Sequence, residues 1–165
     1  RPDIVANAEL MRKLEAIRSA AAVACGFVKE GENATKLSPL RPAISFVSPA
    51  VDYADYVSGK VIKEEEIDFV ARILWNQLPT ETFPGTATVC ISVAAQIEGT
   101  IVNQVCKPRA KEMKFVRFGH ARGINKVEVE VTETSDGFYV KKAVFPRTAR
   151  RIMDGYVYVK RERIQ

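Results

Sequence analysis

The feature that most constrains the fold is the uncharged segment 85–97, which starts with Gly85-Thr86-Ala87 and is apolar on nearly every side. Its length and alanine content favour a helix, and a helix without a polar face is buried all round. We therefore expect a fold in which other elements wrap this segment. On the same ground we expect the thiol of Cys90 to be buried and inert.

The segments after Gly99 supply suitable strands. Residues 114–118 and 126–132 alternate apolar and polar side chains, which is typical of half-buried antiparallel strands. Ser135-Asp136-Gly137 predicts a hairpin turn. Asp154-Gly155 predicts a second hairpin that leads into a terminal strand at 156–160. The expected fold class is α+β, with an antiparallel or mixed sheet wrapped around the central helix.

The first half of the chain contains further periodic segments. Apolar residues at three- and four-residue steps predict a helix over 7–25, with Asn7 and Gly26 suited to its two ends. A short apolar run flanked by prolines predicts a strand at 43–48. An acidic start followed by an apolar stripe predicts a helix over 64–76.

Composition narrows the class of protein. The 165 residues carry a net charge of +5 and are 47% hydrophobic, with three distant cysteines and one histidine. This argues against a disulfide framework, a zinc site or a histidine-rich metal site, and it favours a reducing, cytoplasmic location. The apolar runs are too short to span a membrane, and the basic residues are too dispersed for us to expect a nucleic-acid partner. The chain starts at Arg1 rather than at a methionine, so we expect a processed product or a fragment of a longer protein.

The start of the central helix is a candidate anion site. The first amides of a helix have no intrahelical partner, and that end of the helix is partly positive. A Gly85-Thr86 start lets a carboxylate approach the bare backbone. We assign Gly85, Thr86 and Ala87 to substrate carboxylate binding; the alternative is that Thr86 merely caps a structural helix.

Several motifs together resemble the 2-methylaconitate cis-trans isomerase (PrpF) family. They occur in the family's order along nearly the whole chain: Leu14–Arg18, Asp52-Tyr53, Ile67-Asp68, Gly85-Thr86-Ala87, Gly99–Asn103, Arg117–His120 and Arg147–Val159. The family is similar in fold to diaminopimelate epimerase, in which two halves each wrap a sheet around a central helix. The resemblance divides this chain into an interdomain helix, 1–26, and a C-terminal domain, 27–165, without the N-terminal domain.

The resemblance also implies a chemistry. The family moves a proton and a double bond along a di- or tricarboxylate skeleton without a cofactor or a metal. Its acid–base lysine and cysteine belong to the N-terminal half, so this chain is expected to carry half of a cleft. We therefore expect a partner, either the N-terminal half or a second copy of the chain.

The family's Gly-His-Pro-Ser-Gly element, which borders the cleft, corresponds to residues 119–123. His120 is thereby a candidate catalytic residue, and Arg122 and Gly123 are candidates for substrate binding. Ala121 and Arg122 replace proline and serine here. Arg122 could clamp a carboxylate through two parallel hydrogen bonds, or it could fill the pocket and exclude the ancestral substrate.

A second departure lies before the central helix. The family has a pair of histidines there, whereas this chain has Pro79-Thr80-Glu81-Thr82. Glu81 is the second candidate catalytic residue, as a carboxylate base if it is buried. Pro84 stands where the related epimerase has its second catalytic cysteine, which excludes a two-thiol mechanism. Arg147 completes the candidate substrate-binding set.

We therefore expect part of a cofactor-independent isomerase acting on an aconitate-like substrate. The alternative is a degenerate or repurposed carboxylate-binding module of the same fold. The lost histidine pair and the Ala121-Arg122 replacement favour that alternative.

Overall fold

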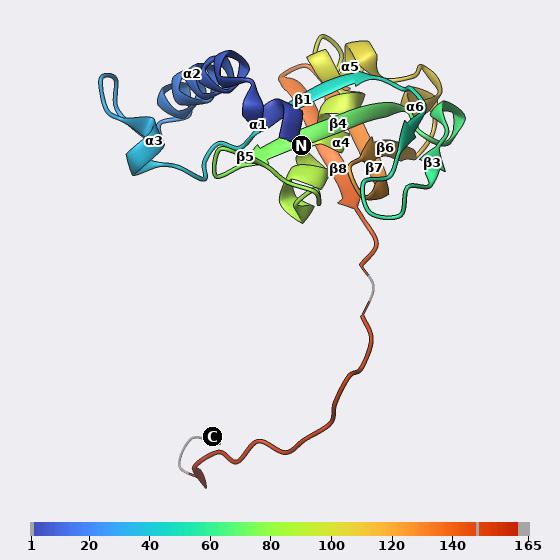
Figure 1. Ribbon diagram of the computed structural model, residues 1–165. Coiled ribbons are helices and arrows are strands. Elements are labelled where there is room, and N and C mark those ends of the chain that lie inside the picture. The colour runs from blue at the N-terminus through green and yellow to red at the C-terminus, as the bar shows by residue number, and fades with distance from the viewer. Residues whose placement is uncertain (1, 148, 162–165) are drawn as a thin grey trace.

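The computed structural model of the protein describes residues 2–147 and 149–161. Figure 1 shows a curved sheet with helices packed on it and a C-terminal segment that leaves the folded body. The helices are α1 Pro2–Ala6, α2 Ala8–Ala24, α3 Ala34–Leu37, α4 Gly85–Gln96, α5 Ile101–Val105 and α6 Arg109–Glu112, with one 3₁₀ turn at Glu64–Glu66. The strands are β1 Ile44–Pro49, β2 Tyr53–Ala54, β3 Val61–Ile62, β4 Phe69–Trp75, β5 Leu78–Pro79, β6 Phe115–His120, β7 Gly123–Thr134 and β8 Gly137–Val144.

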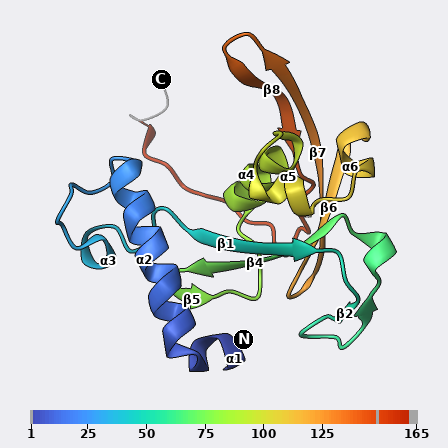
Figure 2. The same ribbon diagram turned by 90° about the horizontal axis from the view of Figure 1, so that it is seen from above.

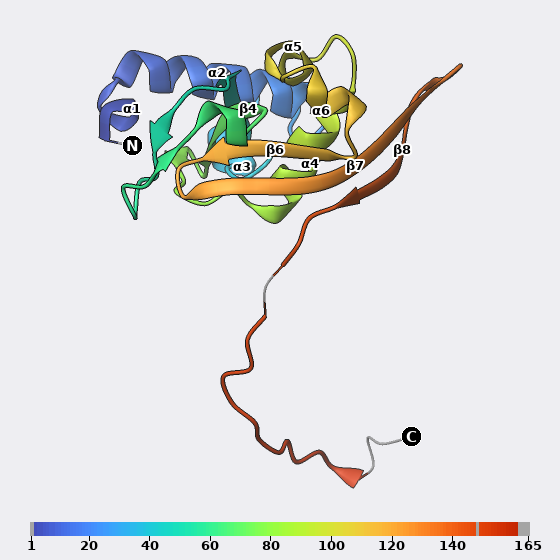
Figure 3. The same ribbon diagram turned by 90° about the vertical axis from the view of Figure 1, so that its right-hand side faces the viewer.

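The main sheet is mixed and has the order β1-β4-β6-β7-β8, with β5 paired to β4. Only the β4–β6 pairing is parallel; the others are antiparallel. Strands β2 and β3 form a separate two-stranded ribbon. Figure 2 shows the sheet bending around α4, and Figure 3 shows the far end of the β7–β8 hairpin projecting beyond the helices. These observations agree with the α+β class and with a helix at the centre of the sheet.

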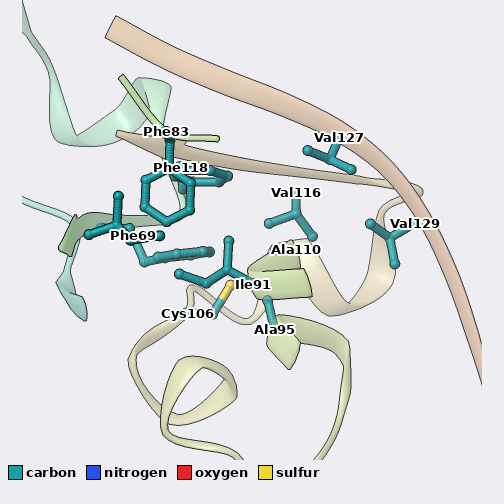
Figure 4. Packing of buried hydrophobic residues seen from close by; sticks show 12 residues of the cluster. Phe69, Phe83, Ile91, Ala95, Cys106, Ala110, Val116, Phe118, Val127 and Val129 are labelled. Atoms are coloured by element: carbon teal, nitrogen blue, oxygen red, sulfur yellow. The ribbon is translucent and has the colours of Figure 1, made fainter. Parts of the chain in front are cut away.

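The main core lies between α4 and the concave face of the sheet. Phe118 is fully buried on β6 and stacks on Phe69 of β4 with ring centroids 5.4 Å apart, while Phe83 meets it edge-on at 5.0 Å. Ile91 and Ala95 bring the buried face of α4 into the same cluster (Figure 4). Aromatic contacts of this kind hold the start of α4 next to the end of β6, where the candidate site residues lie.

The helix expected over residues 64–76 is wrong. The acidic residues form only the 3₁₀ turn Glu64–Glu66, and Phe69–Trp75 forms β4. This strand has neighbours along both edges and is buried on most of its length, so it shows no polar face. A short apolar run of this type has no period that separates a buried strand from a buried helix. Its β-branched and aromatic content was the available signal for a strand.

The central helix is confirmed, but its complete burial is not. On α4 the buried side chains are Thr88, Ile91, Ser92 and Ala95, which share one face. The opposite face is open, and the thiol of Cys90 is exposed. The expectation that Cys90 is buried is therefore wrong, and its expected inertness stays a prediction.

The N-terminal helix, its end at Gly26 and the β7–β8 turn agree with the prediction from the sequence. Asn7 caps α2 by accepting a hydrogen bond from the amide of Leu10, and Gly26 follows the helix with a positive φ of 72°. The β7–β8 hairpin turns at Ser135-Asp136, as expected. Between α4 and β6, however, the structure has the short helices α5 and α6, which the sequence analysis did not predict.

The terminal hairpin at Asp154-Gly155 is also wrong for this chain. Residues 149–160 form no strand, and large apolar side chains in this stretch are exposed, Tyr156 to 94% and Tyr158 to 96%. In Figure 1 this segment runs away from the sheet. An extended apolar segment forms a β-ladder only when a neighbouring strand provides partners for its backbone hydrogen bonds.

Candidate functional site

The candidate site is built around the tight turn between β6 and β7. His120 is the last residue of β6 and pairs with Gly123, the first residue of β7, so that Ala121 and Arg122 form the turn. Gly123 has a φ of 123°, a value that side-chain-bearing residues rarely adopt. The turn therefore depends on this glycine, and it places His120 and Arg122 at one end of the sheet.

His120 is a buried imidazole that forms hydrogen bonds with several neighbouring groups. The backbone amide of Arg122 donates to its Nδ1 over 3.3 Å, so the proton of the neutral ring lies on Nε2. Burial lowers the pKa of His120 below its usual value, and hydrogen bonds with the Glu81 backbone and the Asn125 side chain act in the opposite direction. The net effect is an imidazole that is neutral near pH 7.

Glu81 and Arg122 lie opposite each other across the site. Nη1 of Arg122 is 3.9 Å from Oε2 of Glu81, and the two side chains are 44% and 31% exposed, respectively. An ion pair at this distance and with this solvent exposure contributes little to the stability of the fold. The Arg122 guanidinium can therefore exchange Glu81 for the carboxylate of a ligand at a small cost in free energy.

A side-chain bridge connects His120 to the central helix. Asn125 on β7 interacts with His120 and donates from Nδ2 to Oγ1 of Thr88, which is fully buried on α4. Asn125 is a site residue that the sequence analysis missed. A signal was present, because Asn125 stands in the same inward phase of β7 as Val127 and Val129. A polar residue among inward-facing valines needs a buried partner.

The first turn of α4 forms a second group. No described side chain caps it, because Pro84 precedes the helix. Thr86 is exposed, whereas Gly85 and Ala87 are half-buried. A methyl group on Gly85 would lie only 2.7 Å from Cζ of Phe145, so the ring of Phe145 rests against this helix end. The guanidinium of Arg147 lies 5.6 Å from the centroid of the same ring.

The structure thus gathers the predicted site residues into two groups. Glu81, His120, Arg122 and Gly123 meet at the β6–β7 turn. The α4 start and Arg147 meet at the Phe145 ring; within the described part of the chain, no hydrogen bond or ion pair joins Arg147 to the turn. A cavity of 260 Å³ borders Gly123, and its lining also includes Asp55 and Lys60, but not the start of α4.

Neither a membrane span nor a metal site is found in residues 2–147 and 149–161. None of their helices is long and apolar enough to cross a bilayer. Nor do their histidine, cysteine and acidic side chains gather in a group of three that could hold a metal ion.

Comparison with known proteins places this geometry in a family. The model of the PrpF protein family matches residues 1–160. The chain belongs to the PrpF family. It is 42% identical over 164 residues to 3-methylitaconate isomerase of Eubacterium barkeri, a match that covers 99% of this chain and 42% of that protein. It is 35% identical over 157 residues to 2-methyl-aconitate isomerase of Shewanella oneidensis, covering 95% of this chain and 38% of that protein.

A solved structure supports the same placement in the PrpF family. The crystal structure of methylitaconate-delta-isomerase superposes with a TM-score of 0.83 at 40% sequence identity, covering 98% of this chain and 41% of that one. The mixed sheet curled around α4 is thus the diaminopimelate epimerase-like arrangement expected from the sequence. This PrpF chain spans about two-fifths of the length of the relatives it matches.

Proposed function

We propose that this PrpF-family chain forms the C-terminal half of a cofactor-independent isomerase for an unsaturated di- or tricarboxylate. A base removes a proton from the carbon next to the double bond, the double bond shifts, and a proton is returned at its other end. Atoms and charge balance without an oxidant or a reductant. The observation that carries the proposal is the Glu81–His120–Arg122 group, together with two isomerases as relatives.

The charges of the site fit this reaction. Arg122 and Arg147 are cations for the carboxylates, and the uncapped amides of Gly85, Thr86 and Ala87 offer further donors. Removing the proton builds negative charge on the carbon skeleton next to a carboxylate, and fixed cations stabilise that charge. Residues 1–26 would serve as the interdomain helix and 27–165 as the domain.

We assign Glu81 and His120 assisting roles in proton transfer. A neutral imidazole can accept a proton near pH 7 and return it. The Glu81 carboxylate lies beside Arg122 at the same turn. The principal acid and base would come from the N-terminal half, supplied as the rest of the chain or as a separate polypeptide.

The test is a calorimetric titration with trans-aconitate of this chain assembled with the complementary half. Arg122→Ala should weaken binding about tenfold or more, because one charge-assisted pair is lost. Lys141→Ala is the matched control, since Lys141 is an exposed cation on β8 that pairs with Glu130 at 3.3 Å. No heat from the unmodified assembly, or equal loss in the two variants, would contradict the assignment.

The second candidate is a carboxylate-binding module without catalysis. Two contacts favour it: Arg122 is already paired with Glu81, and the Phe145 ring rests on the proposed amide site. Binding of trans-aconitate without any proton exchange would support this candidate over the first.

A further inference from the structure

The backbone of the β6–β7 turn is held from outside by a neighbouring segment. The hydroxyl of Tyr53 on β2 lies 2.9 Å from the carbonyl oxygens of both His120 and Gly123. Three residues further on, the backbone amide of Tyr56 donates to the carbonyl of Ala121 over 2.8 Å. Three carbonyls of the turn, those of His120, Ala121 and Gly123, are thus contacted on one side by residues 53–56.

The approach of Tyr53 depends on Gly119. A methyl group on Gly119 would lie 2.6 Å from the Tyr53 hydroxyl oxygen and 2.7 Å from Cε1, which is closer than real contacts allow. Gly119 has no positive φ, so space rather than backbone conformation is what this position requires. The glycine that precedes His120 therefore serves the contact with Tyr53.

Arg72 fixes the other face of the ring. Its guanidinium lies 5.0 Å from the centroid of Tyr53, and its Nη1 donates to the carbonyls of Ala71, at 2.8 Å, and Gly119, at 3.3 Å. A cation over an aromatic face is an attractive contact, strengthened by partial burial. Burial also raises the pKa of Tyr53 to about 12, so its hydroxyl remains a donor at any pH the protein meets.

We propose that Tyr53 is a positioning residue for the site: its hydroxyl and ring hold the turn so that His120 and Arg122 face Glu81. The turn is tight, and its carbonyls are held on that side by the Tyr53 hydroxyl and the Tyr56 amide. This inference rests on the proposed function, because only there do His120 and Arg122 act on a substrate. Tyr53 itself touches no reacting atom.

The sole histidine of the chain provides a direct probe. In uniformly ¹⁵N-labelled protein, Tyr53→Phe should move the His120 ring-nitrogen signals and speed amide hydrogen exchange at Arg122 about tenfold or more. Tyr139→Phe is the matched control, because Tyr139 is 61% exposed on β8, far from the turn in sequence. If Tyr53→Phe fails to fold, Gly119→Ala gives the same test, since it displaces the ring and keeps the hydroxyl.

Kinetics of the assembled enzyme complete the test. Tyr53→Phe should lower kcat/KM about tenfold or more, because small misplacements of site groups are costly in rate. Unchanged His120 signals overturn the proposal whatever the activity. Altered signals with unchanged kcat/KM also overturn it. If the unmodified enzyme catalyses no exchange, the proposed function fails on its own, and the His120 signals still decide whether Tyr53 holds the turn.

Discussion

At the residue scale, the site consists of polar groups that form hydrogen bonds with one another. His120 receives the Arg122 amide on Nδ1, and Asn125 carries the network on to Thr88 in α4. The sequence singled out His120 and Arg122 because their motif is local. It gave no role to Asn125, or to Tyr53 within the Asp52-Tyr53 motif, because their roles come from strands brought together by pairing. Of these two residues, only Asn125 had a signal in the sequence, because it stands in the inward phase of β7.

The lowered pKa of His120 predicts a pH dependence of stability. Because the unfolded chain binds the proton more readily than the folded chain, acidification below about pH 6.5 favours unfolding. The stability that the neutral imidazole provides is complete above that pH and is lost as pH falls through the folded-state pKa. An NMR titration of the single histidine should give a pKa below 6.5.

Urea unfolding gives the second readout of the same prediction. Between pH 7.5 and 5.5 the unmodified chain should lose more stability than His120→Gln, which has no group that titrates there. A measured His120 pKa of 6.5 or higher, or the same loss in both proteins, would contradict the burial of a neutral ring.

At the scale of elements, the features that were predicted correctly are those whose signal lies in neighbouring residues. The α2 caps, the α4 start and the β7–β8 turn depend on neighbouring residues and were predicted. β4 was mistaken for a helix, because its burial on both sides comes from distant strands. The burial of α4 was overestimated for the same reason: apolar composition cannot tell which face lacks a neighbour.

Helix α2 is attached to the rest of the chain by a buried polar contact. Arg18 is 2% exposed and donates to both carboxylate oxygens of Glu15 and to the carbonyl of Ser38. Glu15 also accepts from the Thr35 hydroxyl over 2.6 Å. Next to it, a small core of Ala22, Val28 and Ala34 is separate from the main core. The Arg18–Ser38 and Glu15–Thr35 hydrogen bonds thus tie α2 to residues 33–41 beside this small core.

Glu15→Ala should lower the free energy of unfolding by about 3 kcal/mol, because it leaves the buried guanidinium of Arg18 without its counter-charge. Lys13→Ala is the control on the same helix; as an exposed substitution it should change stability by less than about 0.5 kcal/mol. The measurement is urea denaturation near pH 7. Equal effects of the two substitutions would show that the polar network of Glu15 and Arg18 does not hold α2 against residues 33–41.

At the scale of the whole molecule, the exposed apolar side chains form a candidate interaction surface. Ile152, Tyr156 and Tyr158 are at least 81% exposed in a segment that forms no strand, and Ile17 of α2 is half exposed. Large apolar side chains in such numbers on one face or segment mark an interaction surface. The length of the relatives suggests its occupant, since this chain spans about two-fifths of them. We propose that residues 149–160 form a strand only against the complementary half.

The most direct test of the account is proton exchange in D₂O, followed by ¹H NMR of 3-methylitaconate. The samples are this chain alone, the part of 3-methylitaconate isomerase that it does not match, and the two mixed. We predict exchange at the carbon next to the double bond only in the mixture, and its loss when the chain ends at residue 148. A mixture that associates and binds the acid without any exchange would contradict the claim that this chain supplies half of an isomerase site.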